Sequence, residues 1–331
     1  MQQAKMQLLR ELQRAAPLVY PQRNLKDSLQ RAKFCIRALA FPTLTRRWFE
    51  LLGSSAVALI AQRHPRLYSK LQRPYLHRCL STRAQLEILQ HHYRFCSENF
   101  SPAMTQAIYL KSGWMVGRAF LAEHGSISWW LTHDGSVEKE GDLTLSLVDD
   151  SVPRRLCLMS FSVTQWKKAR RELFIGGLQS RRFAEDKERT ITVTRAMHGL
   201  RPKALLLLGL QHLAQFFGVT SMRAVSNGQH IYQHFVKRKV LQADYDAFWT
   251  ESAGCRDADG MFTLPIISKA RDLTDIKATK RQMYRKRYVM IGELAAQFQA
   301  RLEAAFPNTA RAENKTQDRI GQVLPPAHQL V

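Results

Sequence analysis

The residues best suited to chemistry gather in three short segments, 173–179, 198–203 and 224–234, each of which follows or begins an expected strand or helix. These segments combine glycines with residues that carry basic, amide, phenol and imidazole groups. The residues are Gly176, Gly177, Gln179, Gly199, Arg201, Lys203, Asn227, Tyr232 and His234. Glycines let a ligand come close to the backbone, and basic side chains attract anions. We therefore predict that one cleft binds an anionic ligand. The residues that converge on it are Gly199, Arg201, Lys203, Asn227 and His234, with Gly176, Gly177 and Gln179 along its floor.

The segment 198–203 opens a helix that we expect over residues 203–217. The free amide groups and the positive dipole end of such a helix suit an anion such as pyrophosphate, and Arg201 and Lys203 add positive charge there. Structural capping of the helix is the alternative interpretation. Gly176 and Gly177 are similarly compatible with a strand bulge or with close approach of a ligand.

The segment 224–234 offers acid–base groups after an expected strand. His230 and His234 lie four residues apart and share one face of a helix, but no carboxylate or cysteine completes a set of metal ligands, so we predict no metal site. Histidine titrates near neutral pH and tyrosine can protonate a departing thiolate. We therefore predict His234 and Tyr232 as catalytic groups, with packing at the sheet edge as the alternative.

The elements that position these residues belong to a predicted sheet domain over 106–271. Short β-branched or aromatic runs separated by turn signals indicate strands at 106–111, 117–123, 126–132, 142–148, 155–163 and 172–178. Short connections between them imply antiparallel hairpins. After the helix at 203–217, we expect a strand at 220–226, helices at 230–239 and 245–250, and a strand at 261–266.

Helical regions flank this sheet domain. Residues 1–105 show helical periodicity, and up to residue 110 the chain has 17 Lys and Arg against 5 Asp and Glu. A basic helix is expected over 272–306, and its segment 277–287 holds six Lys or Arg and no acid. We expect this helix to lie outside the core of the sheet. The composition of 307–331 predicts a disordered tail. The fold class is therefore α+β, with a mixed or antiparallel sheet.

The charge of the chain favours anionic partners. Its 331 residues carry 50 Lys and Arg against 27 Asp and Glu, which gives a net charge of +23. Nucleic acid, an anionic membrane surface and a phosphate-bearing cofactor all fit such a charge. The five cysteines are scattered singly, so we expect a reduced, cytoplasmic protein without a disulfide framework. No apolar run approaches the ~20 residues that span a bilayer, so membrane contact would be peripheral, at the inner membrane.

Five motifs in order resemble the VirK/YbjX family of Gram-negative bacteria. They lie at 175–179, 199–203, 224–227, 245–249 and 264–265, ahead of the basic C-terminal helix. The resemblance covers roughly residues 20–300. It implies a role in virulence, in the display of surface proteins, in envelope integrity and in resistance to antimicrobial peptides, but it supplies no catalytic residues.

The order strand, helix, strand, helix over 173–239 is also similar to the core of the GCN5-related N-acyltransferases. That similarity implies an acyl-coenzyme A or acyl-carrier-protein donor, with Gly199, Arg201 and Lys203 at its phosphates and Asn227 after the second strand. The family's tyrosine position falls on His234, with Tyr232 nearby, and Gly199–Lys203 replaces the usual phosphate loop. An acyltransferase-like enzyme that modifies an envelope amine is thus one hypothesis. A non-enzymatic protein that binds an anionic membrane surface or a protein partner is the second. Nucleic-acid binding is less supported, because no recognition motif accompanies the charge.

Overall fold

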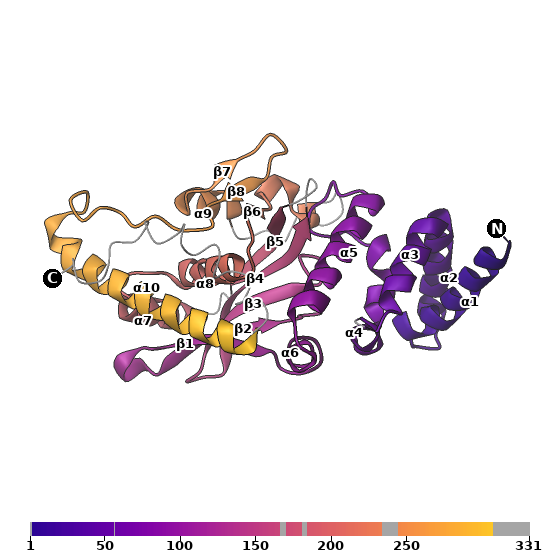
Figure 1. Cartoon of the computed structure of the whole chain (residues 1–331), viewed down its shortest axis with the longest axis horizontal. Helices are drawn as coiled ribbons and strands as arrows, with labels where there is room; N and C mark the ends of the chain where they lie inside the picture. Colours follow the sequence, from indigo (N-terminus) through magenta and orange to yellow (C-terminus); the bar gives the residue numbers. More distant parts are fainter. Residues whose placement is uncertain (1, 56, 166–169, 181–183, 234–243, 307–331) are drawn as a thin grey trace.

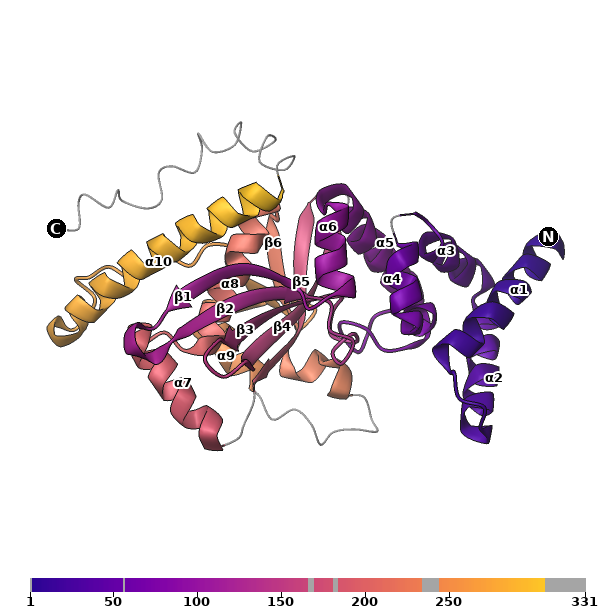
Figure 2. The same ribbon diagram turned by 90° about the horizontal axis from the view of Figure 1, so that it is seen from below.

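An eight-stranded sheet forms the centre of the part of the chain that the computed structural model describes, which is residues 2–55, 57–165, 170–180, 184–233 and 244–306. The N-terminal helices extend from one end of this sheet, and the last helix runs along its other side (Figures 1 and 2). The predicted α+β class, with N-terminal helices, a mixed sheet and a long C-terminal helix, is therefore confirmed. The predicted tail, 307–331, lies outside the described residues.

The N-terminal region is helical, as predicted. Its elements are α1 (Gln2–Val19), α2 (Leu25–Ala40), α3 (Pro42–Leu52), α4 (Ala58–Arg63), the 3-10 helix η1 (Pro65–Gln72), α5 (Thr82–Asn99) and α6 (Pro102–Thr105). Polar side chains cap three of these helices: Asn24 accepts from the amide of Asp27, Ser81 from Ala84, and Ser101 from Met104.

The strands are β1 (Trp114–Phe120), β2 (Ser126–Thr132), β3 (Leu143–Asp149), β4 (Arg154–Gln165), β5 (Arg171–Ser180), β6 (Ser221–Ala224), β7 (Cys255–Arg256) and β8 (Phe262–Leu264). They pair in the order β1-β2-β3-β4-β5-β6-β8-β7. All neighbours are antiparallel except β5 and β6, which are parallel. This parallel pair requires a crossover, and the crossover contains α7 (Ala184–Ala196) and α8 (Pro202–Phe216).

One face of the sheet packs on α8. Leu145, Met159 and Leu178 are in register across β3, β4 and β5, so their side chains share this face. Gly209 of α8 lies so close to the face that a Cβ atom there would be 2.7 Å from the ring of Trp129. The helix can therefore sit directly on the sheet only because residue 209 has no side chain.

The last helix, α10 (Ala278–Ala305), corrects one expectation. Its second half belongs to the core, because Leu294, Phe298 and Leu302 are buried and the ring of Phe298 packs edge-on against Trp129 at 5.3 Å. Only the first half, which holds the basic run, projects from the sheet. The expectation followed from the basic composition of 277–287 and overlooked Leu294, Phe298 and Leu302, which recur every four residues in the second half.

Two further expectations fail locally. The expected strand at 106–111 is wrong, because Gln106–Leu110 continues α6 as a π-helical turn that buries Ile108 and Tyr109. The expected helix at 230–239 is wrong where it can be seen, since Ile231–Gln233 forms one 3-10 turn. Its remainder lies outside the described residues. The helix α9 (Tyr245–Glu251) occurs as expected.

None of the helices that the structure describes is long and apolar enough to cross a bilayer.

Candidate functional site

A buried carboxyl group, that of Glu140, lies against the end of β5. Glu140 is 1% exposed, and the side-chain amide of Gln179 donates to both of its oxygens at 3.0 Å. Gly176 and Gly177 make room for it, because a Cβ atom on Gly177 would lie 2.0 Å from Oε2 of Glu140 and one on Gly176 would lie 2.1 Å from the Glu140 carbonyl oxygen. The glycine pair thus admits close approach by the chain itself, beside a bulge in the β4–β5 pairing.

His230 faces this carboxyl group. Its Nδ1 accepts a hydrogen bond from the backbone amide of Tyr232 at 3.3 Å, so the neutral ring carries its proton on Nε2. That Nε2 atom lies 3.7 Å from Oε1 of Glu140 and has no hydrogen-bond partner among the described residues. His230 is also 1% exposed. An unsatisfied N–H group therefore points at a buried carboxyl group.

Burial shifts both titrating groups of this pair toward their neutral forms. It raises the pKa of Glu140 to about 7, against the opposing hydrogen bond from Gln179. It lowers the pKa of His230 to about 4. At neutral pH the histidine is therefore uncharged, and Glu140 is divided between its protonated and ionised forms. A carboxyl group with this pKa can accept and return a proton near physiological pH.

Two tyrosines complete the cluster. Tyr245 stacks on His230 with ring centroids 5.2 Å apart, and its hydroxyl accepts from the backbone amide of Leu178 at 3.2 Å. Tyr232 lies 5.3 Å from the His230 ring and is partly exposed. Burial and the charge of Glu140 raise the pKa of Tyr232, so its hydroxyl stays protonated at neutral pH and can donate a proton.

The cluster lies where β5 and β6 part. Their parallel pairing covers Glu172 to Ile175 and Ser221 to Ala224, whereas β5 continues to Ser180. The end of β5, which pairs with β4 but has no partner on the β6 side, is therefore free to contact Glu140 and Tyr245. Ligands of open sheets with parallel strands commonly bind where neighbouring strands diverge at their carboxyl ends. We name Glu140, Gln179, His230, Tyr232 and Tyr245 the fork cluster.

The structure brings four of the residues predicted from the sequence together in or beside the fork cluster: Gly176, Gly177, Gln179 and Tyr232. Asn227 is close by, but its side chain binds the start of α9. Its side-chain amide donates to Asp244 at 2.8 Å and its oxygen accepts from the amide of Tyr245 at 2.8 Å. His234 lies outside the described residues. Sequence reasoning missed Glu140, because it lies in a turn far from the three segments. The one available signal was the glycine pair, which indicates that some group approaches the strand closely but does not identify that group.

The remaining predicted residues lie on the other face of the sheet. Leu178 faces α8, so its neighbours Gly177 and Gln179 lie on the opposite face of the sheet. Arg201 and Lys203, in contrast, begin α8. Arg201 is exposed and lies 3.8 Å from Glu251, at the opposite end of α9 from Asn227. The ammonium group of Lys203 lies 6.0 Å from the ring of Phe248.

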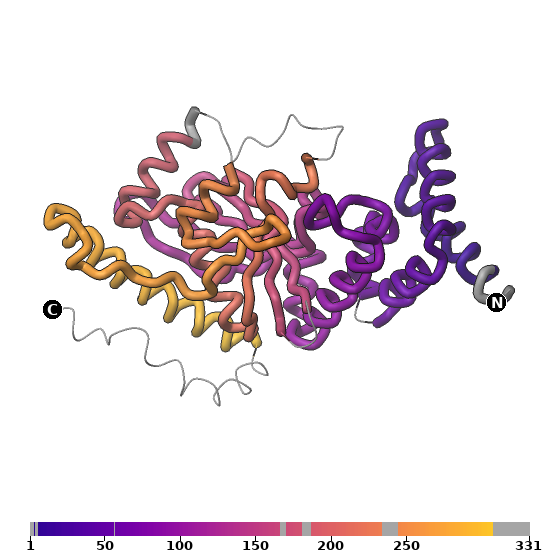
Figure 3. Tube along the Cα trace, turned by 90° about the horizontal axis from the view of Figure 1, so that it is seen from above, coloured from indigo at the N-terminus to yellow at the C-terminus, as the bar shows by residue number. Residues whose placement is uncertain are grey.

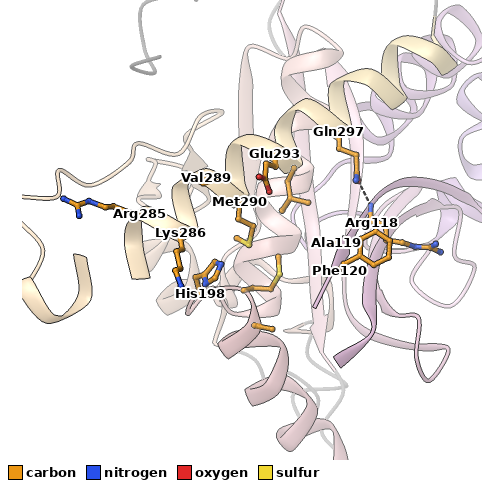
Figure 4. A pocket seen from close by; sticks show the side chains of 13 residues that line it. Arg118, Ala119, Phe120, His198, Arg285, Lys286, Val289, Met290, Glu293 and Gln297 are labelled. Carbon is orange, nitrogen blue, oxygen red and sulfur yellow. Dashed lines mark hydrogen bonds between the residues drawn. The ribbon is translucent and has the colours of Figure 1, made fainter. Parts of the chain in front are cut away.

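Gly199 lies in the turn that follows α7, with a φ of 82° that favours glycine. The guanidinium group of Arg287 covers this turn and donates to the carbonyl oxygen of His198 at 2.6 and 2.9 Å. Next to it, a groove of about 580 Å³ lies between residues 285–297 of α10, the end of α7 and the end of β1 (Figure 4). Arg285 and Lys286 lie toward one end of this groove, beside His198, and give that end a positive charge, whereas Glu293 lines its middle. The groove suits an anionic group with an apolar arm.

No group of three histidine, cysteine, aspartate or glutamate side chains within the described ranges could hold a metal ion.

Comparison with known proteins identifies relatives of this chain. A family model described as "Protein of unknown function (DUF535)" matches residues 23–300. "Uncharacterized protein YbjX" of Escherichia coli (strain K12) is 33% identical over 272 residues, which cover 81% of this chain and 82% of that protein. Two proteins of Haemophilus influenzae (strain ATCC 51907 / DSM 11121 / KW20 / Rd), each described as "Uncharacterized protein", are 32% and 31% identical over 39% of this chain and 44% and 43% of their own lengths.

Proposed function

Since the chain belongs to the DUF535 family, the VirK/YbjX family that its motifs resemble, we propose that it supports the bacterial envelope as an enzyme that transfers an acyl group to an amine. The observation that carries this proposal is the Glu140–His230 pair, buried where β5 and β6 part. The parallel unit of β5, α8 and β6 also agrees with the strand–helix–strand order of the N-acyltransferases.

An acyl thioester, held by coenzyme A or an acyl carrier protein, would supply an activated carbonyl group and a phosphate-bearing arm. Among the described residues, the phosphates fit on the α8 face, where Arg201 and Lys203 begin the helix and Arg285 and Lys286 line the adjoining groove. This face of the sheet is opposite Glu140, so the arm of the donor would have to pass the ends of β5 and β6 to bring its carbonyl group to Glu140. The phosphates do not fit at Asn227 or at the glycine pair, because Asn227 binds α9 and Glu140 fills the space over the glycines.

In the proposed reaction Glu140 acts as the general base. Its carboxylate takes a proton from the attacking amine, and Gln179 holds the carboxylate in place. As Glu140 ionises, Nε2 of His230, which lies 3.7 Å from Oε1 of Glu140, would move to hydrogen-bond distance and donate its proton to that oxygen. Tyr232 donates a proton to the departing thiolate. The proton on Glu140 then passes to the tyrosinate and regenerates the neutral hydroxyl group of Tyr232. A nitrogen–carbon bond forms, the carbon–sulfur bond breaks, and the proton lost by the amine ends on sulfur.

We predict that Glu140→Gln lowers acyl transfer about 100-fold, a loss typical of removing a general base. The assay measures thiol release from acetyl- or palmitoyl-coenzyme A with vesicles of phosphatidylethanolamine, a lipid that carries a primary amine. For the unaltered protein the rate should rise with pH as Glu140 ionises near its pKa of about 7, and Glu140→Gln should lose this rise.

Glu172→Gln is the matched control for this substitution. Like Glu140, Glu172 is a buried glutamate whose pKa is raised by burial, but it belongs to β5 and lies at the other end of the β5–β6 pair. Its substitution should leave the rate within about twofold, as expected for a residue outside the reaction. Absence of thiol release from the unaltered protein with both donors, or equal rates for Glu140→Gln and the unaltered protein, would reject acyl transfer at Glu140.

A further inference from the structure

The exposed side of α2 is apolar. Leu25, Leu29, Ala32, Ile36, Leu39 and Ala40 all face solvent, and the exposed fractions reach 79% for Leu25 and 68% for Ile36. Their spacing of three and four residues places them on one stripe of the helix. Phe34 and Ala38, on the opposite side, are the residues by which α2 packs on the protein. The helix is therefore amphipathic, with a second apolar face that the described residues leave uncovered.

Positive charge borders this stripe. Lys26, Lys33 and Arg37 are exposed and lie along one side of it at helical spacing. The only acid of α2, Asp27, accepts a hydrogen bond from the amide of Gln22 and lies away from the stripe, near the buried side. Leucine and isoleucine flanked by lysine and arginine form the pattern of helices that lie in the surface of a membrane.

The position of α2 leaves the stripe accessible to a flat surface. The helix stands with α1 at the end of the molecule that is remote from α10 (Figures 1 and 3). From Leu25 to Ala40 it is about 22 Å long at 1.5 Å per residue. A membrane could therefore contact the whole stripe without contacting the sheet.

We propose that the exposed face of α2 docks this protein on an anionic lipid bilayer, with the apolar stripe in the acyl boundary and Lys26, Lys33 and Arg37 at the headgroups. The charges favour this occupant over a second copy, because a copy of this chain brings the same positive charge and a net +23. The six apolar side chains also fall well short of the roughly 20–30 residues per side of a stable protein interface. The inference does not depend on the acyl-transfer reaction, and its test involves no thioester.

The experiment is flotation of the full-length protein with vesicles of phosphatidylcholine alone or with about one third phosphatidylglycerol, at low and high salt. Each leucine or isoleucine that leaves water raises the partition coefficient about tenfold or more. We therefore expect Leu29→Gln combined with Ile36→Gln to reduce vesicle binding at least tenfold at either salt concentration. Each basic side chain near an anionic leaflet adds about fivefold. Lys33→Gln combined with Arg37→Gln should therefore remove most of the preference for phosphatidylglycerol.

Two double variants serve as controls. Val152→Gln with Ile191→Gln removes exposed apolar side chains from the sheet domain, and Lys277→Gln with Lys280→Gln removes exposed charge from the region around the start of α10. Both should retain vesicle binding. The stripe variants carry substitutions only at exposed positions, so their unfolding transitions should match that of the unaltered protein.

Four outcomes would overturn the inference. The unaltered protein could fail to bind phosphatidylglycerol vesicles. It could bind them equally well after both stripe residues are replaced, or lose binding only in the Lys277 and Lys280 variant, which would assign the contact to α10. It could instead form dimers by light scattering that the stripe variant abolishes, without binding vesicles, which would assign the stripe to a second copy.

Discussion

Replacing Lys70 by methionine will lower the free energy of unfolding by about 3–5 kcal/mol, as expected when one member of a buried ion pair is removed. The ammonium group of Lys70 lies 2.5 Å from Oδ1 of Asp142, and their side chains are 5% and 0% exposed. Loss of the lysine leaves a carboxylate in the interior without a compensating charge. The neighbouring carbonyl oxygen of Glu138 also loses a donor at 3.1 Å.

Asp142 is held by more than the lysine. The hydroxyl groups of Tyr75, Tyr93 and Ser162 donate to its carboxylate, from Tyr93 at 3.1 Å and from Ser162 at 3.3 Å. Lys70 and the hydroxyl group of Tyr75 keep the pKa of Asp142 far below its usual range despite burial. Asp142→Asn should therefore cost about as much as the lysine substitution, because it leaves the ammonium group unpaired.

A double-mutant cycle in urea tests this pair. The combined variant, Lys70→Met with Asp142→Asn, should be more stable than the sum of the two single losses predicts, because neither charge is then left alone. Arg83→Met is the control: Arg83 and Glu87 form an exposed pair at 3.3 Å, and its loss should change stability by no more than about 0.5 kcal/mol. Additive losses at Lys70 and Asp142, or a loss at Lys70 no larger than that at Arg83, would contradict the prediction.

This polar network also explains how the N-terminal helices attach to the sheet. Lys70, Tyr75 and Tyr93 come from the helical region, whereas Asp142 and Ser162 come from the sheet or from the turn that enters β3. Such long-range pairing depends on residues 49 to 87 positions apart and has no local signature. Sequence reasoning therefore found the helices and the strands but not the contacts that join them.

Alternating and continuous apolar runs located the strands well. The prediction at 126–132 matches β2 at both ends, and the predictions for β3, β4 and β5 miss by two residues at most. Periodicity failed where burial did not follow the local pattern. Residues 106–110 carry strand-forming side chains, yet Ile108 and Tyr109 are buried from a helical turn. Helical periodicity indicated helices over residues 1–105, but only the structure shows that an apolar stripe of α2 faces solvent.

The candidate site was predicted in part for a similar reason. Gly176, Gly177 and Gln179 signal a close neighbour, but a sequence cannot say whether that neighbour is a ligand or another part of the chain. The structure identifies it as Glu140. The face of the sheet on which a β5 residue lies also depends on the bulge at Gly176. A pattern of apolar and polar residues does not reveal such a bulge. Gln179 and Arg201 consequently lie on opposite faces.

Lowering the pH from 7 to 5 will destabilise this protein steeply. Burial lowers the pKa of five histidines to about 4, and the five are His77, His92, His133, His212 and His230. Each takes up a proton near pH 6.5 when the chain unfolds but not in the folded protein. The stability that a depressed histidine pKa provides is complete above pH 6.5 and is lost as the pH falls toward 4. Each contributes at most about 3 kcal/mol, since one pKa unit corresponds to about 1.4 kcal/mol.

Glu140 acts in the opposite direction. Because its pKa is raised to about 7, the folded protein binds a proton between pH 7 and 4.5 that the unfolded chain releases, so Glu140 gains stability as the pH falls. Glu172, with a pKa that burial also raises, adds to this gain. The histidines still outnumber the two glutamates. The unfolded chain should therefore bind more protons than the folded protein near pH 5, and each additional proton corresponds to a loss of about 1.4 kcal/mol per pH unit.

Urea unfolding between pH 8 and 5 measures this slope directly, and His212→Leu tests its cause. The Nε2 atom of His212 has no hydrogen-bond partner among the described residues, and its ring stacks on Phe298 at 5.6 Å. Leucine retains apolar contact there but takes up no proton on unfolding, so the variant should lose about 1 kcal/mol per pH unit less than the unaltered protein. His124→Gln, at an exposed position, should leave the slope unchanged. Stability that stays constant from pH 8 to 5, or a slope unaffected by His212→Leu, would show that these histidines are charged in the folded protein.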